Sequence, residues 1–290
     1  MEIIKENGNI ILNDAADFDI SHIFECGQCF RWDRQTDGTY LGVARGKVLK
    51  VGQEGARVTF FDTAWEEFQA VWRPYFDLDT DYGRVKDALC ADDVLRRAVV
   101  YGAGIRLLRQ DVWECIVSFI LSAGNNIPRI KKIINTLCRT FGAPVEYGNK
   151  TYYTFPGPEK LAGLSLKDIA CIKAGFRDKY ILDAAVKIAG GELRLSDLEN
   201  TDDAEAKKML MRIDGVGNKV ADCILLFGLA RRAWFPVDVW IRRIIQYYYF
   251  QDAKTADDIA AFSRRRFGEL GGYAQQYLFF YARENKIGIA

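Results

Sequence analysis

Residues 209–227 read MLMRIDGVGNKVADCILLF. An apolar helical run meets Gly215-Val-Gly217, and a second helix is predicted to start directly after it, with Lys219 in its first turn. Two glycines two residues apart permit a positive φ and the close approach of another backbone. Free N–H groups at the start of the second helix favour a phosphate. The pattern over about residues 206–228 is therefore typical of a helix-hairpin-helix that grips the DNA backbone, and an ordinary helix–helix turn has the same Gly-x-Gly spacing.

A further helix start lies 19 residues after Lys219, where Phe235-Pro-Val-Asp238 leads into another apolar run. Asp238 is the expected N-cap of that helix. An amine and a carboxylate at two such helix starts are expected to face one cleft. Positive potential at a helix start favours the neutral, nucleophilic form of a lysine. Taken alone, Lys219 is equally compatible with a phosphate contact and Asp238 with a cap only.

Composition bounds the class of protein. The chain has 290 residues, which predicts two or three packed domains, and 49% hydrophobic with 27% charged residues is typical of a globular protein. The sequence has no apolar window long enough for a membrane span and no signal-peptide pattern, so we expect an intracellular protein, in the cytoplasm and nucleoid of a bacterium or the nucleus of a eukaryote. Seven cysteines favour reduced thiols over a disulfide framework.

The net charge of +1 hides a strong asymmetry along the chain. Residues 1–95 carry 10 basic and 18 acidic residues, so the remaining residues have a net charge of +9. This asymmetry favours a nucleic-acid surface in the second part of the chain. A solvated helical surface is the alternative interpretation.

The periodicity predicts an α+β protein. Residues 1–85 form an expected antiparallel β domain, because the segments 39–44, 47–51 and 56–61 are short, rich in β-branched and aromatic residues, and separated by glycines. Residues 86–290 are expected to be helical and to form two subdomains.

Several helices have predicted ends. A buried helix is expected around Trp113 to Ile120, and another between an N-cap at Asn126 and Gly142. Residues 152–158 read as a loop, Ser165 to Asp168 as a capping box, and Gly190 as the end of a helix that begins near Arg177.

At four separate places the chain resembles the 8-oxoguanine DNA glycosylases of the helix-hairpin-helix (HhH-GPD) superfamily. The first three are Gly-Val-Gly-Asn-Lys followed by Pro-Val-Asp, Gly27-Gln-Cys-Phe-Arg-Trp32, and Asn125-Asn-Ile-Pro-Arg129. The fourth runs from Gly272 to Phe279. The resemblance covers about residues 15–285, and the order of the four matches makes it much more specific than any one of them.

The resemblance implies a bifunctional enzyme that acts on duplex DNA containing oxidised guanine. Lys219 would attack C1′ of the damaged nucleoside, expel the base and form a Schiff base that undergoes β-elimination, with Asp238 in support. Gly27 would accept the N7–H that distinguishes 8-oxoguanine from guanine. Cys223 and Phe279 would sandwich the flipped base and Gln275 would bind its pairing edge. The contacts with DNA or with the orphaned base would come from Asn125, Arg129, Phe176, Arg177, Gly215, Gly217 and Trp240.

The sequence departs from the family pattern at two places. Gly124 stands where the family has the first of three consecutive asparagines, so the side chain that fills the space left by the lesion is either missing or supplied by Asn125. Trp240 stands where a histidine is frequent, and it is expected either to contact a phosphate or to pack under the loop. Both departures bear on the opposite base and on the DNA grip rather than on the reaction.

Alternatives concern metals, cofactors and activity. Cys26-Gly-Gln-Cys29 could suggest zinc or thiol chemistry, but no second Cys pair accompanies it. The last cysteine is Cys223, so the C-terminal four-cysteine cluster of endonuclease III relatives is excluded. We therefore expect no metal or cofactor. We also expect a monomer. The other functional hypotheses are a non-catalytic module that binds damaged DNA and a glycosylase for other oxidised or alkylated purines.

Overall fold

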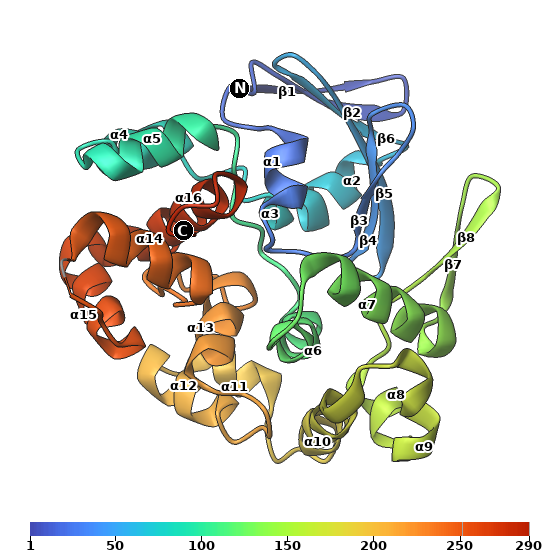
Figure 1. The fold of residues 1–290 in the computed structure, drawn as a ribbon. Helices are drawn as coiled ribbons and strands as arrows, with labels where there is room; N and C mark the ends of the chain where they lie inside the picture. The colour runs from blue at the N-terminus through green and yellow to red at the C-terminus, as the bar shows by residue number, and fades with distance from the viewer. Residues whose placement is uncertain (251, 290) are drawn as a thin grey trace.

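The computed structural model describes residues 1–250 and 252–289. Its first part is a six-stranded antiparallel sheet in the order β1-β2-β6-β5-β4-β3 (Figure 1). The strands predicted at 39–44, 47–51 and 56–61 are confirmed as β4, β5 and β6, and the sequence analysis missed β1, β2 and β3. The strand bounds are β1 Glu2–Glu6, β2 Asn9–Asn13, β3 Trp32–Arg34, β4 Tyr40–Ala44, β5 Lys47–Glu54 and β6 Arg57–Phe61.

An aromatic core lies between this sheet and the helices that cover it. These are α1 (Ile20–Glu25) and a continuous helical segment formed by α2 (Trp65–Glu67), a π-helical turn and α3 (Arg73–Tyr75). Phe24 stacks on Trp32 at a centroid distance of 4.1 Å, and both rings are fully buried. Large buried aromatic rings contribute more apolar area than any other side chain, so this cluster anchors the sheet to its helices.

The rest of the chain is helical, as predicted, apart from one hairpin. The hairpin strands are β7 (Pro144–Tyr147) and β8 (Lys150–Tyr153), so the prediction of a loop over 152–158 was wrong for its first two residues, and also for Pro158, which begins a helix. The helix bounds are α4 Tyr82–Leu89, α5 Asp93–Tyr101, α6 Val112–Ser122, α7 Ile127–Phe141, α8 Pro158–Ala162, α9 Leu166–Ile169, α10 Asp178–Ala189, α11 Leu195–Asn200, α12 Asp203–Leu210, α13 Asn218–Phe227, α14 Val239–Tyr249, α15 Ala256–Phe267 and α16 Gly271–Glu284.

The predicted helix ends agree with the observed ones. The Asn126 side chain caps α7 by accepting from the Arg129 N–H, and Ser165 and Asp168 form the expected capping box, although α9 is only four residues long. Gly190 ends α10. Helix α6 is buried throughout except at Glu114 and Ser122, because its sequence is almost wholly apolar.

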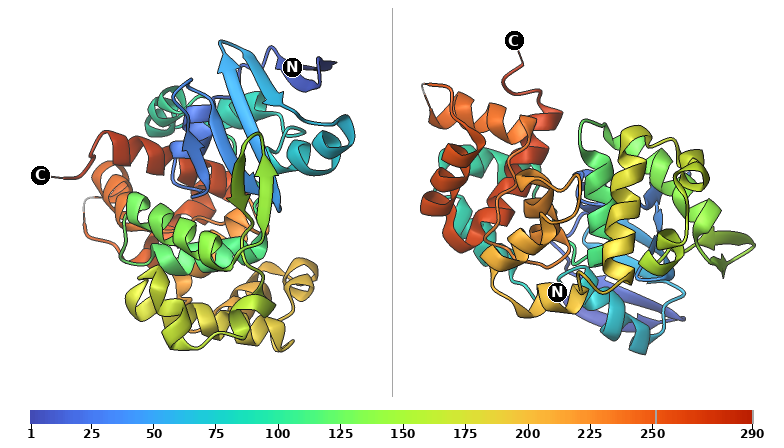
Figure 2. Two further views of the ribbon diagram at one scale, coloured as in Figure 1. Left: turned by 90° about the vertical axis from the view of Figure 1, so that its right-hand side faces the viewer. Right: turned by 90° about the horizontal axis from the view of Figure 1, so that it is seen from below.

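The helices pack in two groups around α6 and α13 (Figures 1 and 2). One group contains α7 to α10, and the other contains α14 to α16. Helix α5 follows the sheet in sequence but packs against α16. No helix in the described ranges is both long and apolar enough to cross a membrane.

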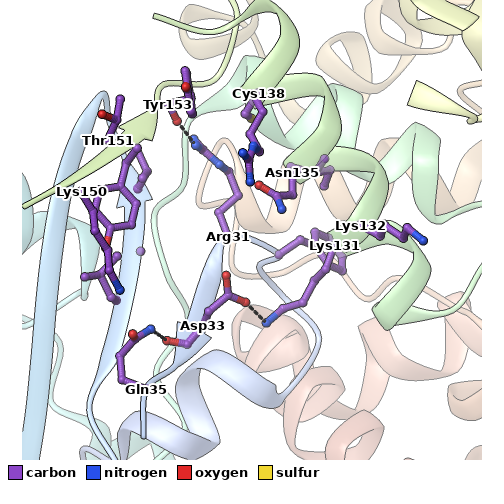
Figure 3. Close-up of a pocket in the computed structure, with 17 residues that line it drawn as sticks. Arg31, Asp33, Gln35, Lys131, Lys132, Asn135, Cys138, Lys150, Thr151 and Tyr153 are labelled. Atoms are coloured by element: carbon purple, nitrogen blue, oxygen red, sulfur yellow. Dashed lines mark hydrogen bonds and ion pairs between the residues drawn. The ribbon is translucent and has the colours of Figure 1, made fainter. Parts of the chain in front are cut away.

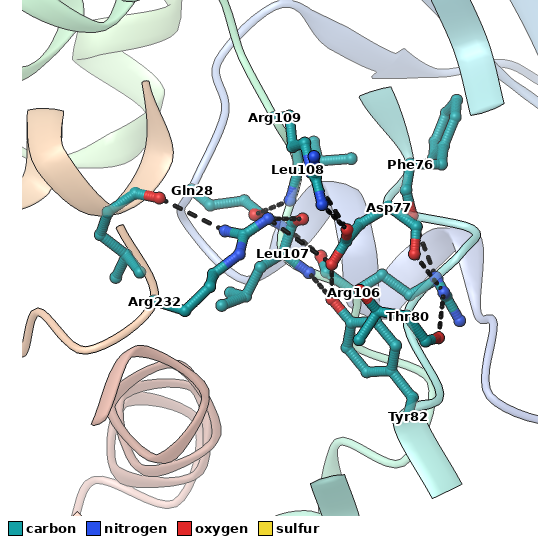
Figure 4. Close-up of polar contacts among 11 residues, drawn as sticks. Gln28, Phe76, Asp77, Thr80, Tyr82, Arg106, Leu107, Leu108, Arg109 and Arg232 are labelled. Atoms are coloured by element: carbon teal, nitrogen blue, oxygen red, sulfur yellow. Dashed lines mark hydrogen bonds and ion pairs between the residues drawn. The ribbon is translucent and has the colours of Figure 1, made fainter. Parts of the chain in front are cut away.

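A buried polar network joins the sheet part to the helical part (Figure 4). The Asp77 carboxylate is 1% exposed and forms ion pairs with Arg109 at 2.8 Å and Arg232 at 3.6 Å. The Arg106 guanidinium donates to the backbone carbonyls of Phe76 and Asp77. A buried carboxylate needs such partners, because an unpaired buried charge costs several kcal/mol or more.

Candidate active site

A cavity of about 730 Å³ lies where the α6–α7 loop, α13, the start of α14 and α16 meet. Its lining includes the predicted catalytic pair and all four predicted lesion-binding residues. From the predicted DNA-contacting set it includes only Asn125 and Trp240. The predicted residues that line it are Gly27, Asn125, Lys219, Cys223, Asp238, Trp240, Gln275 and Phe279. Residues from nearly both ends of the chain therefore meet in one place.

Lys219 and Asp238 reach this cavity from two helix starts. Lys219 lies in the first turn of α13, and its Nζ donates to the Ser122 Oγ at 3.0 Å and lies 5.5 Å from the centre of the Phe119 ring. Asp238 is the N-cap of α14, as predicted, and accepts from the Ile241 N–H at 2.8 Å. Burial raises the pKa of the Asp238 carboxyl, while the Ile241 N–H and the Lys219 charge act in the opposite direction.

Gly27 lies in a turn that the surrounding residues hold rigidly. Its φ is +85°, and a Cβ added there would lie 3.0 Å from both the Phe279 Cε1 and the Arg283 Nη1. The side chain of Gln276 donates to the carbonyl that precedes Gly27, at 2.7 Å. Gln28, which is fully buried, donates to the Arg106 carbonyl and accepts from the Leu108 N–H. The backbone carbonyl of Gly27 is thereby fixed at the cavity wall, and only glycine fits the position.

The other three predicted lesion-binding residues differ in burial and in hydrogen bonding. The Cys223 side chain is buried, which raises its pKa to about 11, so the thiol is neutral at physiological pH. Phe279 is partly buried and packs against the core. Gln275 is 5% exposed, and its Oε1 has no hydrogen-bond partner among the described residues. A buried amide oxygen without a donor is costly, which indicates that Gln275 is arranged to bind something that enters the cavity.

The predicted orphan-base residues lie outside the cavity lining, and their surroundings differ. Phe176 is 62% exposed and lies under the Arg177 guanidinium, 4.3 Å from its Cζ. Arg177 is only 6% exposed and donates to the backbone carbonyls of Ala123, Gly124 and Ala174. Arg129 is exposed at the start of α7. Arg177 therefore stabilises the turn that contains the Gly124 departure, whereas Arg129 is accessible.

Asn125 in the α6–α7 loop and Trp240 in α14 each contact residues that are near them in sequence. The Asn125 side chain donates back to the Leu121 carbonyl at 3.2 Å. Trp240 lines the cavity, and the Arg243 guanidinium lies 5.1 Å from its ring centre.

The hairpin before α13 has the expected glycine geometry. Gly215 has a φ of +81°, and a Cβ added there would lie 2.4 Å from the Tyr180 Cδ2. Gly217 is the N-cap of α13, and a Cβ there would meet nothing within 4 Å. The first N–H groups of α13 therefore have no capping side chain from residue 217.

The sequence analysis missed Ser122, Gln276 and Arg283 as cavity residues. Ser122 contacts Lys219 across 97 residues of sequence, and no local pattern signals such a pair. Gln276 and Arg283 lie on α16, one residue and eight residues after Gln275. Gln276 is three residues before Phe279 and Arg283 is four residues after it, and this same-face spacing was the available signal.

The Cys26 thiol is bound locally, and a second cavity lacks the predicted site residues. The Cys26 thiol donates to the Ile23 carbonyl, and burial raises the pKa of Cys26 to about 11. Among residues 1–250 and 252–289, no group of three or more potential metal-ligating His, Cys, Asp or Glu side chains occurs. A second cavity of about 710 Å³ between β3, β4, α7 and β8 contains none of the predicted site residues, and its Arg31 and Lys131 pair with neighbouring groups (Figure 3).

Comparison with known proteins identifies the family. The N-terminal domain of 8-oxoguanine DNA glycosylase matches residues 10–116, and the HhH-GPD superfamily of base excision DNA repair proteins matches residues 117–269. A probable N-glycosylase/DNA lyase of Methanothermobacter thermautotrophicus is 30% identical over 78% of this chain and 77% of its own.

Two solved structures resemble the whole chain. The Clostridium acetobutylicum 8-oxoguanine glycosylase/lyase, in complex with double-stranded DNA that contains cytosine opposite 8-oxoguanine, is 43% identical over 99% of both chains, with a TM-score of 0.96. MBOgg1, in complex with a low-affinity DNA ligand, is 46% identical over 98% of this chain and 99% of its own, also with a TM-score of 0.96. The chain therefore belongs to the HhH-GPD superfamily of base excision DNA repair proteins.

Proposed function

We propose that this protein is a bifunctional DNA glycosylase that excises 8-oxoguanine from duplex DNA and then cleaves the strand at the abasic site. One observation carries the proposal: a lysine amine, a partly buried carboxylate and a buried amide oxygen that has no partner among the described residues line the same cavity. The names of the similar proteins described above support the same activity. Every group that the mechanism uses comes from one chain, so we propose a monomer that acts wherever the cell holds its DNA.

The reaction follows from the chemistry of the pair. The Lys219 amine attacks C1′ of the flipped nucleotide, the C1′–N9 bond breaks as the base leaves with the electron pair, and a proton released by the attacking nitrogen ends on the departing base. The sugar ring then opens to a Schiff base, loss of a C2′ proton expels the 3′ phosphate, and water later releases the amine. Positive charge develops on the sugar during base loss, and the Asp238 carboxylate stabilises it in a site from which bulk water is excluded.

Recognition of the lesion uses the rigid Gly27 turn. Its carbonyl accepts the N7–H of 8-oxoguanine, whereas guanine would present a lone pair to the same carbonyl and leave both acceptors without a donor. The Gln275 Oε1 accepts from the pairing edge of the base, which satisfies the oxygen that has no partner among the described residues. The base stacks between Cys223 and Phe279, and flipping is required because C1′ is inaccessible in the duplex.

Borohydride trapping tests the enzyme assignment. Wild-type protein and Lys219→Gln are incubated with a labelled duplex that contains 8-oxoguanine opposite each of the four bases. We expect a covalent adduct and strand cleavage for the wild type and neither for Lys219→Gln, which should still bind the duplex. Tight binding by the wild type without an adduct would instead favour a non-catalytic damage-binding module. Preferential release of an alkylated purine would favour the other glycosylase hypothesis.

A further inference from the structure

Arg283 lies at the end of the cavity beside the Gly27 turn, and neither the predicted mechanism nor the family resemblance uses it. It is near the C-terminus of α16 and lines the same cavity as Gly27, Gln275 and Phe279. Its side chain is 17% exposed. A guanidinium in this position bears directly on which base the cavity accepts.

Two of the three guanidinium nitrogens are anchored. Nη2 donates to the Glu25 carbonyl at 2.6 Å, and Nε donates to the Glu284 carboxylate at 2.8 Å. Nη1 is buried and has no hydrogen-bond partner among the described residues. Because the other two nitrogens fix the plane of the group, the direction of Nη1 is set. A buried charged donor without an acceptor carries a larger desolvation penalty than a neutral one.

The unpartnered nitrogen lies beside Gly27, the residue that is proposed to read the N7 edge of the base. A Cβ added at Gly27 would lie 3.0 Å from Nη1 and 3.0 Å from the Phe279 Cε1. The Phe279 ring centre is 5.4 Å from the Arg283 Cζ, so this ring occupies the space in front of the guanidinium. A purine that enters beside Gly27 and stacks on the Phe279 ring would separate this ring from the guanidinium and exchange a cation–π contact for a hydrogen bond.

We propose that the Arg283 Nη1 donates a hydrogen bond to an exocyclic carbonyl oxygen on the N7 edge of the flipped base, next to the N7–H that Gly27 accepts. This inference rests on the proposed function. In 8-oxoguanine two such oxygens flank N7, one at C8 and one at C6. On the protein, the Arg283 Nη1 donor lies beside the Gly27 carbonyl acceptor. On the base, a carbonyl oxygen that accepts lies beside the N7–H that donates. A base with neither oxygen leaves Nη1 unpaired.

The test measures binding rather than turnover, in the Lys219→Gln background, by fluorescence anisotropy with four duplexes. These contain 8-oxoguanine, 8-oxoadenine, guanine or a tetrahydrofuran abasic analogue. Adding Arg283→Met should weaken binding of 8-oxoguanine about 10- to 100-fold, the value of one charge-assisted hydrogen bond. Binding of the abasic analogue, which has no base to contact, should be unchanged.

The two oxygens are distinguished by 8-oxoadenine, which has the C8 oxygen but an amine at C6. An equal loss for both oxidised bases assigns the contact to the C8 oxygen, and a loss confined to 8-oxoguanine assigns it to the C6 oxygen. Arg283→Lys should lose most of the same affinity, because one ammonium cannot hold the Glu25 carbonyl and reach the base together.

Gln276→Met is the matched control for a purely structural role, because Gln276 also holds the Gly27 turn through the Cys26 carbonyl. It should lower the melting temperature and reduce the preference for 8-oxoguanine over guanine, because the carbonyl that reads N7 is then less firmly held. If Arg283→Met lowers the melting temperature as Gln276→Met does, or weakens the abasic duplex as much as the 8-oxoguanine duplex, Arg283 is a clamp or a phosphate contact and the inference is wrong. If Lys219→Gln alone does not prefer 8-oxoguanine over guanine, the proposed function fails instead.

Discussion

The two glycines of the hairpin should respond very differently to the same change. Gly215→Ala places a Cβ 2.4 Å from the Tyr180 Cδ2 on a backbone with a φ of +81°. Gly217→Ala places a Cβ in open space, on a residue with a φ of −93° that any L-residue adopts. Both variants remove a glycine from Gly-Val-Gly, so each is the control for the other.

Two terms set the size of the Gly215→Ala effect. The left-handed backbone costs an alanine about 1–2 kcal/mol. Carbon atoms in contact lie about 3.5–4.0 Å apart, so the Tyr180 ring or the hairpin must shift by roughly 1 Å, and overpacking of this kind costs about 1–3 kcal/mol. Alanine also restricts the unfolded chain, which returns about 0.4–1 kcal/mol. We therefore expect a net loss of about 2–4 kcal/mol.

The assay is thermal unfolding, supported by urea unfolding. In a chain of this size, such a loss lowers the melting temperature by roughly 4–16 °C, whereas Gly217→Ala should shift it by no more than about 2 °C. Tyr180→Ala removes the overlap, so the Gly215→Ala change should cost about 1–3 kcal/mol less in that background. Equal losses for the two glycine variants, or no coupling with Tyr180, would refute the steric argument.

Four further predictions concern the site and its surroundings. Asp238→Asn keeps an N-cap of equal quality but removes the carboxylate charge, so single-turnover base release should fall by orders of magnitude while the melting temperature changes little; near wild-type turnover would reduce Asp238 to a cap. Burial raises the pKa of Glu114 to about 7, so the folded state retains a proton that the unfolded state releases above its ordinary pKa of 4.5, and wild-type stability falls as pH rises through this window. Relative to wild type, Glu114→Gln should therefore gain about 3 kcal/mol of unfolding free energy between pH 4 and pH 8, and a pH-independent difference would contradict the burial of a charged carboxylate. Arg129→Ala and Arg177→Ala should each reduce excision opposite cytosine far more than opposite adenine, and only Arg177→Ala should also lower the melting temperature, because only Arg177 holds the turn at Ala123; equal losses opposite both bases would make the two arginines phosphate contacts. Affinity for undamaged duplex should fall steeply with salt, by about 0.9 in the slope of log K against log salt for each phosphate contact, and a flat response would mean that the charge asymmetry is only a solvated surface.

Local chemistry explains what the sequence predicts well. Asp238 and Asn126 are recognisable as caps because a short polar side chain before an apolar helical run satisfies free N–H groups within three residues. The same holds for the strands β4 to β6, whose turns carry Gly46 and Gly55 at positive φ. The missed strand β1 lies at the edge of the sheet and is largely exposed, so burial imposes little pattern on it.

Apart from the expected meeting of Lys219 and Asp238, the cavity could be predicted only through the family resemblance. The residues that line it come from α13, α14 and α16, from the α6–α7 loop and from the Gly27 turn, and nothing in the spacing of the other elements along the chain says that they converge there. Residues whose role depends on a tertiary partner were missed for that reason. Ser122 resembles any polar residue at a helix end until Lys219 is placed beside it.

The position of Gly27 shows why the specificity of this site depends on residues that never touch the base. A single carbonyl distinguishes an N–H from a lone pair only if it cannot rotate away, because a mobile carbonyl would turn toward solvent rather than face guanine. Gln276 donates to the carbonyl of Cys26, the residue before Gly27, and Gln28, the residue after Gly27, is anchored to the Arg106 carbonyl. Both glutamines are at least 98% buried. The Gln28 carbonyl in turn accepts from the Gln110 side chain at 2.6 Å.

Gln28 also binds the segment that contains Arg106, and through Asp77 this segment is tied to Arg232 in the helical part (Figure 4). The charged network between the two parts of the chain therefore sets the rigidity of the proposed lesion-reading turn, so that substitutions at Asp77 are expected to reduce discrimination between 8-oxoguanine and guanine without altering any group in the cavity.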